Sequence, residues 1–480
     1  MVHFFRFLTF FLYGGITDID IFKEVKFMHT NQLSLTEGSI WKGMLLFAMP
    51  VFFGNLFQQL YNAFDAWVVG RFLGETALAA VSSSGNLIFL MVGFFNGVAM
   101  GAGAVIARYY GAKDYDMLKK SIHTVTALGL VSGLFLTIVG VAFTPTILRW
   151  MNTPENVLPQ SVAYFRYYSY GVVFVVMYNV FVGILHAVGD SRHPLYYLIA
   201  STLINVILDL IFVGVLHMGV GSAAMATTIS QGISALLCCI HLLRSKDVYR
   251  LEWKLIRCHK TSARDILRIG VPSGVQNSVI SIANVVVQSS INTFGAAAMA
   301  GCGANSKLEG FVFLPVTCFT QALATFVGQN LGAQQYGRVK KGVRFGIICC
   351  MILAEIIGIF AYNFAPQMIG FFNDTPEVVD FGVRHMRVTT LFYCLLAFSH
   401  CVAAVMRGAG KAAVPMYTML ICWCLIRITY ITLALKVVNQ LETVSWAYPI
   451  TWTCSSIVFL IYSLKVDWMH SYEEPAKTVI

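Results

Sequence analysis

The chain has 480 residues, of which 57% are hydrophobic and only 12% are charged. This composition excludes an ordinary soluble domain, in which about a quarter of the residues are charged. The formal net charge of +10 could suggest a nucleic-acid partner. The basic residues, however, gather in loops between apolar segments, as they do on the cytoplasmic side of membrane proteins. We therefore expect no nucleic acid.

Residues 1–38 are predicted to form an N-terminal extension and a cytoplasmic segment. The apolar run from Phe4 to Tyr13 is short and is followed by Asp18, not by a small-residue cleavage site, so a signal peptide is not expected. Met28 precedes a polar stretch that leads into the first long apolar segment. The functional chain therefore begins either at the first residue or at Met28.

Twelve apolar segments follow, each of roughly 20 residues or more and long enough to cross a bilayer as a helix. They are predicted near 42–70, 78–108, 121–142, 160–186, 194–216, 221–243, 265–295, 303–330, 342–363, 382–406, 415–437 and 442–465. The charged stretch 244–264 between segments six and seven is either an amphipathic helix on the membrane surface or a plain tether. It divides an N-lobe at 39–243 from a C-lobe at 265–465, which a cytoplasmic tail at 466–480 follows.

The second set of six segments repeats the spacing of the first about 221 residues later. The matching pairs are Gly111 and Gly332, Tyr115 and Tyr336, Gly189 and Gly410, and Pro194 and Pro415. Internally repeated bundles of this size are typical of secondary transporters. Because six is an even number, both halves enter the membrane from the same side. The predicted fold is an all-α membrane protein with two parallel six-helix repeats around a central cavity.

Basic residues are distributed unevenly between the two sides of the predicted bundle. The five loops after segments two, four, six, eight and ten contain eighteen Lys and Arg, against six on the opposite side. Because basic residues stay on the cytoplasmic side, both termini are predicted to be cytoplasmic.

Polar residues at membrane depth mark a site or a path unless they only join helices. The first segment carries a polar stripe on one face, and the seventh segment carries another at matching positions. The predicted lining of the substrate cavity is Asn55, Gln58, Tyr61, Asn62, Asn277, Ser281, Asn284, Gln288 and Glu309. The alternative for the stripes is hydrogen bonding between helices inside each lobe. The roles of Glu355 and Arg427 stay open.

Two acids lie deep in the predicted N-lobe. Asp65 ends the first polar stripe, and Asp209 follows Asn205 by one helical turn in the fifth segment. The repeat positions of the two acids are Val287 and Tyr430, so a purely structural role, which would require acids in both halves, is disfavoured. Two neighbouring carboxyls can carry a proton or, when ionised, coordinate a hard cation. We therefore predict coupling to H⁺ or Na⁺.

No other cofactor and no enzymatic reaction are expected. The twelve cysteines include no C-x-x-C pair, so they indicate neither a metal nor a redox framework. The chain has no Gly-rich phosphate loop after a strand, and neither a nucleophile–base set nor a metal-ligand set emerges from the sequence.

At these residues the chain resembles the multidrug and toxic compound extrusion (MATE) family, over roughly residues 38–465. The resemblance rests on residues 61–71 (YNAFDAWVVGR), on residues 327–333 (VGQNLGA), and on the run from Gly189 through Pro194 to Asp209. It implies cation-coupled efflux of amphipathic, often cationic, organic compounds by rocking between outward-open and inward-open forms.

By the same resemblance, Asp65, Asn205, Asp209 and Thr227 form an ion site for H⁺ or Na⁺ in the N-lobe, with Thr228 as the competitor of Thr227. The family branch with further acids in the seventh and tenth helices is not matched. This favours a branch similar to the MepA-like bacterial exporters.

The resemblance further implies a monomer in the bacterial cytoplasmic (inner) membrane, with membrane lipid and small-molecule drugs or toxic metabolites as its partners. The alternative within this architecture is a lipid-linked-sugar flippase, whose pyrophosphate headgroup would require several Arg or Lys in the cavity. A non-transporting receptor or scaffold is a second alternative, and it would not lower the accumulation of dyes in cells.

Overall fold

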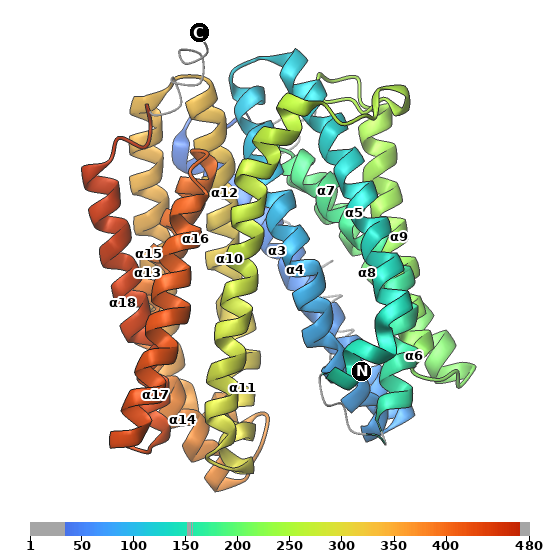
Figure 1. Ribbon diagram of the computed structural model, residues 1–480, viewed down its shortest axis with the longest axis vertical. Helices are drawn as coiled ribbons and strands as arrows, with labels where there is room; N and C mark the ends of the chain where they lie inside the picture. The colour runs from blue at the N-terminus through green and yellow to red at the C-terminus, as the bar shows by residue number, and fades with distance from the viewer. Residues whose placement is uncertain (1–33, 151–154, 156, 471–480) are drawn as a thin grey trace, which may run out of the picture.

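The structure is a computed structural model that describes residues 34–150, 155 and 157–470. Within these residues all regular secondary structure is helical (Figure 1). The expectations for residues 1–27 and Met28 lie outside the described residues, as does the end of the predicted tail from residue 471.

The helices of the N-lobe follow the order predicted from the apolar segments. They are α3 (Ile40–Leu73), α4 (Glu75–Gly111), α5 (Tyr115–Trp150), α6 (Leu158–Tyr170), α7 (Val172–Ala187), α8 (Arg192–Asp209) with the π-helical turn η1 (Leu210–Val215), and α9 (Gly221–Arg244).

The C-lobe repeats this order after a short 3₁₀ turn, η2 (Trp253–Leu255). Its helices are α10 (Lys260–Asn292), α11 (Ala296–Val312), α12 (Leu314–Gly332), α13 (Tyr336–Gly370), α14 (Pro376–Thr390), α15 (Tyr393–Gly408), α16 (Ala413–Met419) with the π-helical turn η3 (Leu420–Ile426), α17 (Arg427–Val437) and α18 (Leu441–Lys465).

Three predicted spans are bent in the middle. The pairs α6 and α7, α11 and α12, and α14 and α15 bend by 47°, 41° and 55° at short breaks. With each bent pair counted as one span, up to ten spans in the described residues are long and apolar enough to cross a membrane. The remaining two predicted segments are the long helices α4 and α10, which face each other across the two lobes.

The lobes touch along α4 and α10, where two pairs of glycines allow the backbones to meet. A Cβ atom added to Gly97 or Gly101 of α4 would lie 2.5 Å from the Cα of Gly274 or Gly270 of α10. Small residues four apart let membrane helices approach this closely. The glycines that end α4 and α12, Gly111 and Gly332, also lie against the backbone of the opposite lobe.

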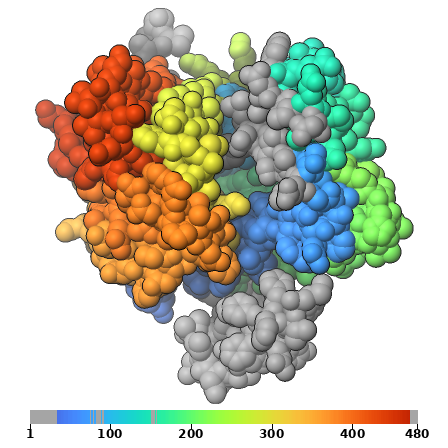
Figure 2. All heavy atoms as spheres, turned by 90° about the horizontal axis from the view of Figure 1, so that it is seen from below, coloured from blue at the N-terminus to red at the C-terminus, as the bar shows by residue number. Residues whose placement is uncertain are grey.

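These contacts close one end of the molecule and leave the other end open. In Figure 1 the lobes converge toward the top, where the turns after α4 and α12 lie, and diverge toward the bottom. Viewed from below in Figure 2, the surface is hollowed between the blue and green helices of the N-lobe and the yellow and orange helices of the C-lobe. The open end is the one opposite the basic loops.

Helix α3 packs against both lobes. Near its beginning, Met44 and Phe47 are fully buried in a cluster with Phe326 and other residues of the C-lobe. Near its end, Val68 and Val69 are buried in a cluster of the N-lobe. The helix that carries the first polar stripe is therefore held at both ends by different lobes, and a change in the angle between the lobes must act on it.

The linker between the lobes forms no amphipathic helix: between α9 and α10 only Trp253–Leu255 are helical. The chain docks on the N-lobe through backbone groups. The N–H of Glu252 donates to His123 Nε2 at 3.0 Å, and the N–H of His259 donates to the Thr124 hydroxyl at 3.1 Å. Bonds to α5 hold this segment, so the plain tether is the alternative that the structure favours.

Candidate functional site

A cavity of about 600 Å³ lies on the inner side of the N-lobe. Its described lining comes from α3, α4, α6, α7, α8 and α9, and only Gln321 comes from the C-lobe. It extends from Ser191 and Pro194 near the closed end toward Asp65 and Val81 near the open end. The cavity therefore belongs to one lobe and faces the hollow between the two.

The polar stripe of α3 forms one wall of this cavity, as the sequence predicts. The lining includes Asn55, Gln58, Tyr61, Asn62 and Asp65. Their spacing of three or four residues places them on one face of a helix. The carboxyl of Asp65 is nearly buried, with an exposed fraction of 7%, and its Oδ1 has no hydrogen-bond partner among the described residues.

Asn205 and Asp209 lie behind the cavity wall. Both are fully buried on α8, and Asp209 is its last residue before the π-helical turn η1. The Asn205 side-chain amide and both carboxyl oxygens of Asp209 have no hydrogen-bond partner among the described residues. Asp209 is close enough to Asp65 for their charges to interact. Leaving such groups unpaired in a dry interior is costly, which sets this pair apart from the other buried polar groups of α8.

The structure places the two competing threonines of α9 differently. Thr227 lines the cavity, and its hydroxyl donates to the carbonyl of Ala223 at 3.1 Å, which leaves the oxygen lone pairs available. Thr228 donates to the carbonyl of Tyr167 and does not line the cavity. Of the two, Thr227 is the one beside the predicted ion-coupling residues.

The cavity also contains side chains that the sequence reasoning did not single out. They are Asn96, Tyr164, Tyr168, Tyr178, Asn179, His186 and Gln231. Each is a polar or aromatic residue inside a predicted span, and that position is the sequence feature that could have identified it as a cavity residue. Whether these side chains face the cavity depends on how α4, α6, α7 and α9 are rotated about their axes. The sequence of an apolar helix with weak periodicity does not show that rotation.

The polar stripe of span seven, which lies on α10, does not line this cavity. The Asn277 side chain donates to the carbonyl of Gly93 at 3.3 Å, across the contact between the lobes, and the Ser281 hydroxyl donates to the carbonyl of Asn277 at 2.9 Å. Gln288 is exposed and donates to Asn292 at 2.8 Å. In this conformation these groups bind other helices or their own.

Asn284 and Glu309 join a second polar network, in the C-lobe. The Asn284 side-chain oxygen accepts from Arg427 at 3.4 Å. The Glu309 carboxyl accepts from Asn305 at 3.1 Å and from the Tyr393 hydroxyl at 3.4 Å. Because span eight begins at Ala296, Glu309 lies near the bend between α11 and α12, not near the outer end of the span. Neither residue lines the N-lobe cavity.

Arg427 is the largest fully buried side chain among the described residues, with an exposed fraction of 1%. It donates to the Thr451 hydroxyl at 2.9 Å and lies over the rings of Tyr448 and Trp423, at 4.7 and 5.3 Å from their centroids. Cation–π contacts are strongest where water is excluded. The guanidinium thus links α17, α18 and η3. Its positive charge also attracts the carboxyl of Glu309.

Arg427→Ala is expected to destabilise the C-lobe. Removing one member of a buried charged network costs about 3 kcal/mol because its partners stay buried, which should lower the unfolding temperature of purified protein by about 3 °C. The measurement is thermal unfolding in detergent at one fixed scan rate. Arg344→Ala, which removes an exposed arginine, is the matched control and should unfold like the unchanged protein. Equal unfolding of both variants would contradict the structural role of Arg427.

Two repeated lobes that meet at one end and diverge at the other, with a polar cavity on the inner side of the N-lobe, are the architecture of a membrane transporter. The sequence profile of the MatE family matches residues 50–211 and 272–433, which cover most of the first five spans of each lobe. The chain belongs to the MATE family.

Two curated relatives are similar over most of their length. The probable multidrug resistance protein YoeA of Bacillus subtilis (strain 168) is 31% identical over 385 residues, which cover 78% of this chain and 83% of YoeA. The multidrug export protein MepA of Staphylococcus aureus (strain MSSA476) is 23% identical over 80% of this chain and 85% of MepA. A solved structure, described as the outward-facing conformation of a multidrug resistance MATE family transporter, has a TM-score of 0.86. It is 22% identical and covers 92% of this chain and 99% of that one.

Proposed function

We propose that this protein exports amphipathic, cationic organic compounds across the bacterial cytoplasmic membrane by antiport with H⁺ or Na⁺. The observation that carries the proposal is the acid pair Asp65 and Asp209, which is buried beside the cavity with carboxyl oxygens that lack hydrogen-bond partners among the described residues. We further propose that the chain acts as a monomer with both termini in the cytoplasm. The cavity then opens to the outside.

The chemistry of the cavity supports a cationic or neutral substrate. In its described lining, Asp65 is the one acid, and lysine and arginine are absent. Tyrosine rings and amides make up much of the remaining wall, and aromatic faces attract organic cations. A lipid-linked-sugar flippase would need basic groups for a pyrophosphate, so this lining disfavours it. The names of the relatives, multidrug resistance and multidrug export, agree with efflux.

The coupling follows from competition for the negative charge. Protons or Na⁺ ions that enter from the outside reduce the negative charge of Asp65 and Asp209, which weakens the attraction for a cationic substrate and releases it outward. The neutralised pair favours the inward-open form, in which the ion leaves to the cytoplasm and the acids regain their affinity for substrate. A preference of a few kcal/mol for one form is enough to drive each change.

The proposal is tested in proteoliposomes that contain the purified protein and an imposed pH gradient or an imposed Na⁺ gradient. A fluorescent organic cation should move against its own gradient in one of the two arms, and an ionophore that dissipates that gradient should stop it. Liposomes without protein serve as the control. If neither gradient moves the dye while the protein is folded, antiport of organic cations is refuted.

A further inference from the structure

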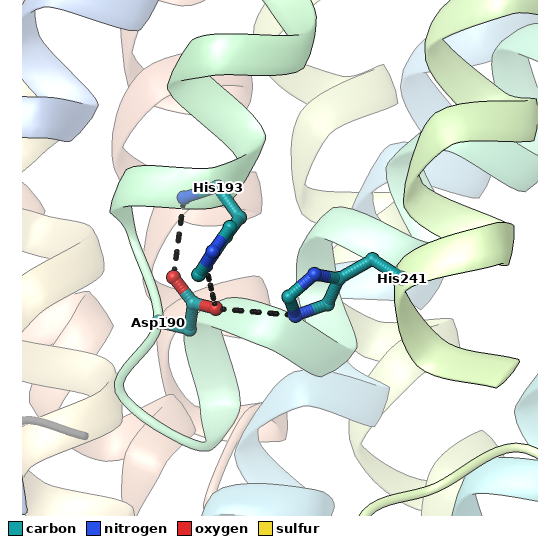
Figure 3. A group of neighbouring side chains, drawn as sticks. All are labelled: Asp190, His193 and His241. Atoms are coloured by element: carbon teal, nitrogen blue, oxygen red, sulfur yellow. Dashed lines mark hydrogen bonds and ion pairs between the residues drawn. The ribbon is translucent and has the colours of Figure 1, made fainter. Parts of the chain in front are cut away.

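Three side chains of types that can bind a metal meet at the closed end of the N-lobe, and none of the three lines the cavity (Figure 3). Asp190 lies in the turn between α7 and α8, His193 in the first turn of α8, and His241 in the last turn of α9. The Asp190 Oδ2 lies 2.6 Å from His193 Nδ1 and 3.6 Å from His241 Nε2. One potential ligand atom from each residue lies within 4.8 Å of the other two.

The turn before α8 holds the Asp190 carboxyl in place. Gly189 has φ of +91°, which favours glycine, and the N–H of Asp190 donates to the carbonyl of Leu185 at 2.9 Å. Its Oδ1 accepts the backbone N–H groups of Arg192 and His193, each at 3.2 Å. The Oδ2 is left facing both imidazoles.

His241 is held in the orientation of a ligand. Its Nδ1 lies 3.0 Å from the Tyr197 hydroxyl. When Nδ1–H donates to that hydroxyl, the lone pair of the ring is on Nε2, and such a contact to the second ring nitrogen is typical of metal-bound histidine. The Nε2 is buried, has no hydrogen-bond partner among the described residues, and stops 3.6 Å short of Asp190 Oδ2. A cation between the two atoms would satisfy both.

The repeat indicates that the fold does not require these side chains. The C-lobe keeps the glycine of the turn as Gly410, with φ of +79°. The repeat positions of the three ligands are Lys411, Val414 and Tyr462, none of which forms such a cluster. The same turn and helix start therefore form without the carboxyl and the imidazoles, so these groups have a role beyond building the turn.

We propose that Asp190, His193 and His241 bind one divalent transition-metal ion of the zinc class. Two imidazoles and one carboxylate are ligands that Zn²⁺ prefers, and ligand atoms in a tetrahedral site lie about 3.3 Å apart. The distances of 2.6 and 3.6 Å bracket that value. The His193 side chain is 47% exposed, so the fourth position is open to water.

A metal at this place would join the turn before α8 to the end of α9. Ser191, next to Asp190 in the chain, lines the cavity near its closed end. A bound ion would therefore stiffen the closed end of the N-lobe, where the cavity wall meets the turn before α8. The expected consequence is slower transport at saturating metal, without any part for the ion in the coupling itself.

The test measures metal binding directly on the full chain. The protein is purified through an affinity tag without histidines, stripped with a chelator and titrated in detergent with Zn²⁺ against a chromophoric chelator. Co²⁺, whose visible absorption reports its ligand geometry, is the second probe. We expect one equivalent of Zn²⁺ to bind and to raise the unfolding temperature.

Variants separate this site from other histidines. His241→Ala and His193→Ala should each weaken Zn²⁺ binding at least about 100-fold, and Tyr197→Phe about 10-fold. His470→Ala is the matched control. His470 pairs with Asp467 at 2.7 Å and at the same spacing in the chain, but that pair belongs to no three-ligand group among the described residues. This variant should bind like the unchanged protein. His241→Gln replaces His241→Ala if the alanine variant does not fold.

Failure of the unchanged protein to bind one equivalent of Zn²⁺ or Co²⁺ would overturn the proposal. Equal Zn²⁺ binding by the unchanged protein and by the double variant of His193 and His241 would also overturn it. The same holds if His470→Ala weakens Zn²⁺ binding as much as His241→Ala does. Because these binding measurements do not depend on transport, they test the metal site independently of the proposed efflux.

Discussion

Asp209→Asn and Asp65→Asn are each expected to abolish gradient-driven extrusion of organic cations while the protein remains folded in the membrane. Asparagine has nearly the shape of aspartic acid but cannot gain or lose a proton and cannot neutralise a cation. A lost coupling of about 3 kcal/mol corresponds to a roughly 150-fold change in affinity or in the ratio of two conformations. Dye accumulation in cells that express equal amounts of each variant should therefore match that of cells without the protein.

Folding should survive these substitutions because the carboxyl oxygens of Asp209 accept no hydrogen bond from the described residues. Replacing an unpaired buried acid by a neutral group is often neutral or stabilising, so the unfolding temperature should stay the same or rise. Asp116→Asn, at an exposed acid with a side-chain exposure of 75%, is the control and should extrude normally. Normal extrusion by both buried-acid variants would refute the assignment of the ion site.

Gly101→Ala is expected to prevent the lobes from closing at the end that carries the turns after α4 and α12. Its new methyl group would lie 2.5 Å from the Cα and the N of Gly270, and a helix backbone cannot move aside as a flexible side chain can. Overpacking of this kind costs about 3 kcal/mol, which changes the ratio of two conformations roughly 150-fold. Because alternating access needs both forms, dye efflux should fall close to background.

Gly303→Ala on α11 is the matched control, since a methyl group there meets no atom within 4 Å. It carries the same loss of glycine flexibility but adds no clash, so it should transport like the unchanged protein. Gly97→Ala, which faces Gly274 at 2.5 Å, should behave like Gly101→Ala. If Gly101→Ala transports normally, then the closed form of this interface takes no part in the transport cycle.

The two lobes share a fold but differ in the charge that they bury. In the N-lobe, α8 ends in Asp209 beside the cavity. In the C-lobe, the corresponding helix contains Arg427, which hydrogen bonds and stacking rings hold in place. The carboxyl of Asp209 has no hydrogen-bond partner among the described residues, whereas Arg427 and Glu309 have partners. This difference favours ion coupling in the N-lobe and a structural role for the C-lobe network.

Several features of the molecule could be predicted from the chain because they depend on local chemistry. Apolar length predicted the helices, the repeat predicted two equivalent lobes, and the spacing of Asn55, Asn62 and Asp65 predicted one polar face, on which these three residues line the cavity. The bends in three spans were missed, because apolar composition continues through a bend.

Other features depended on which helix faces which. Periodicity defines the face of a helix but not its neighbour, so the stripe of span seven looked like a second cavity wall, although Asn277 binds α4. Likewise, Asp209 lies behind Asp65 only because α8 packs against α3 and α9. His241 meets Asp190 only because α9 returns beside the turn before α8. The sequence by itself determined the helices, their duplication and the deep acids, since these follow from hydrophobicity and spacing along one chain. The tertiary structure alone decided which polar groups share a cavity or a ligand set, since the rotation and packing of helices bring together residues that are distant in the chain.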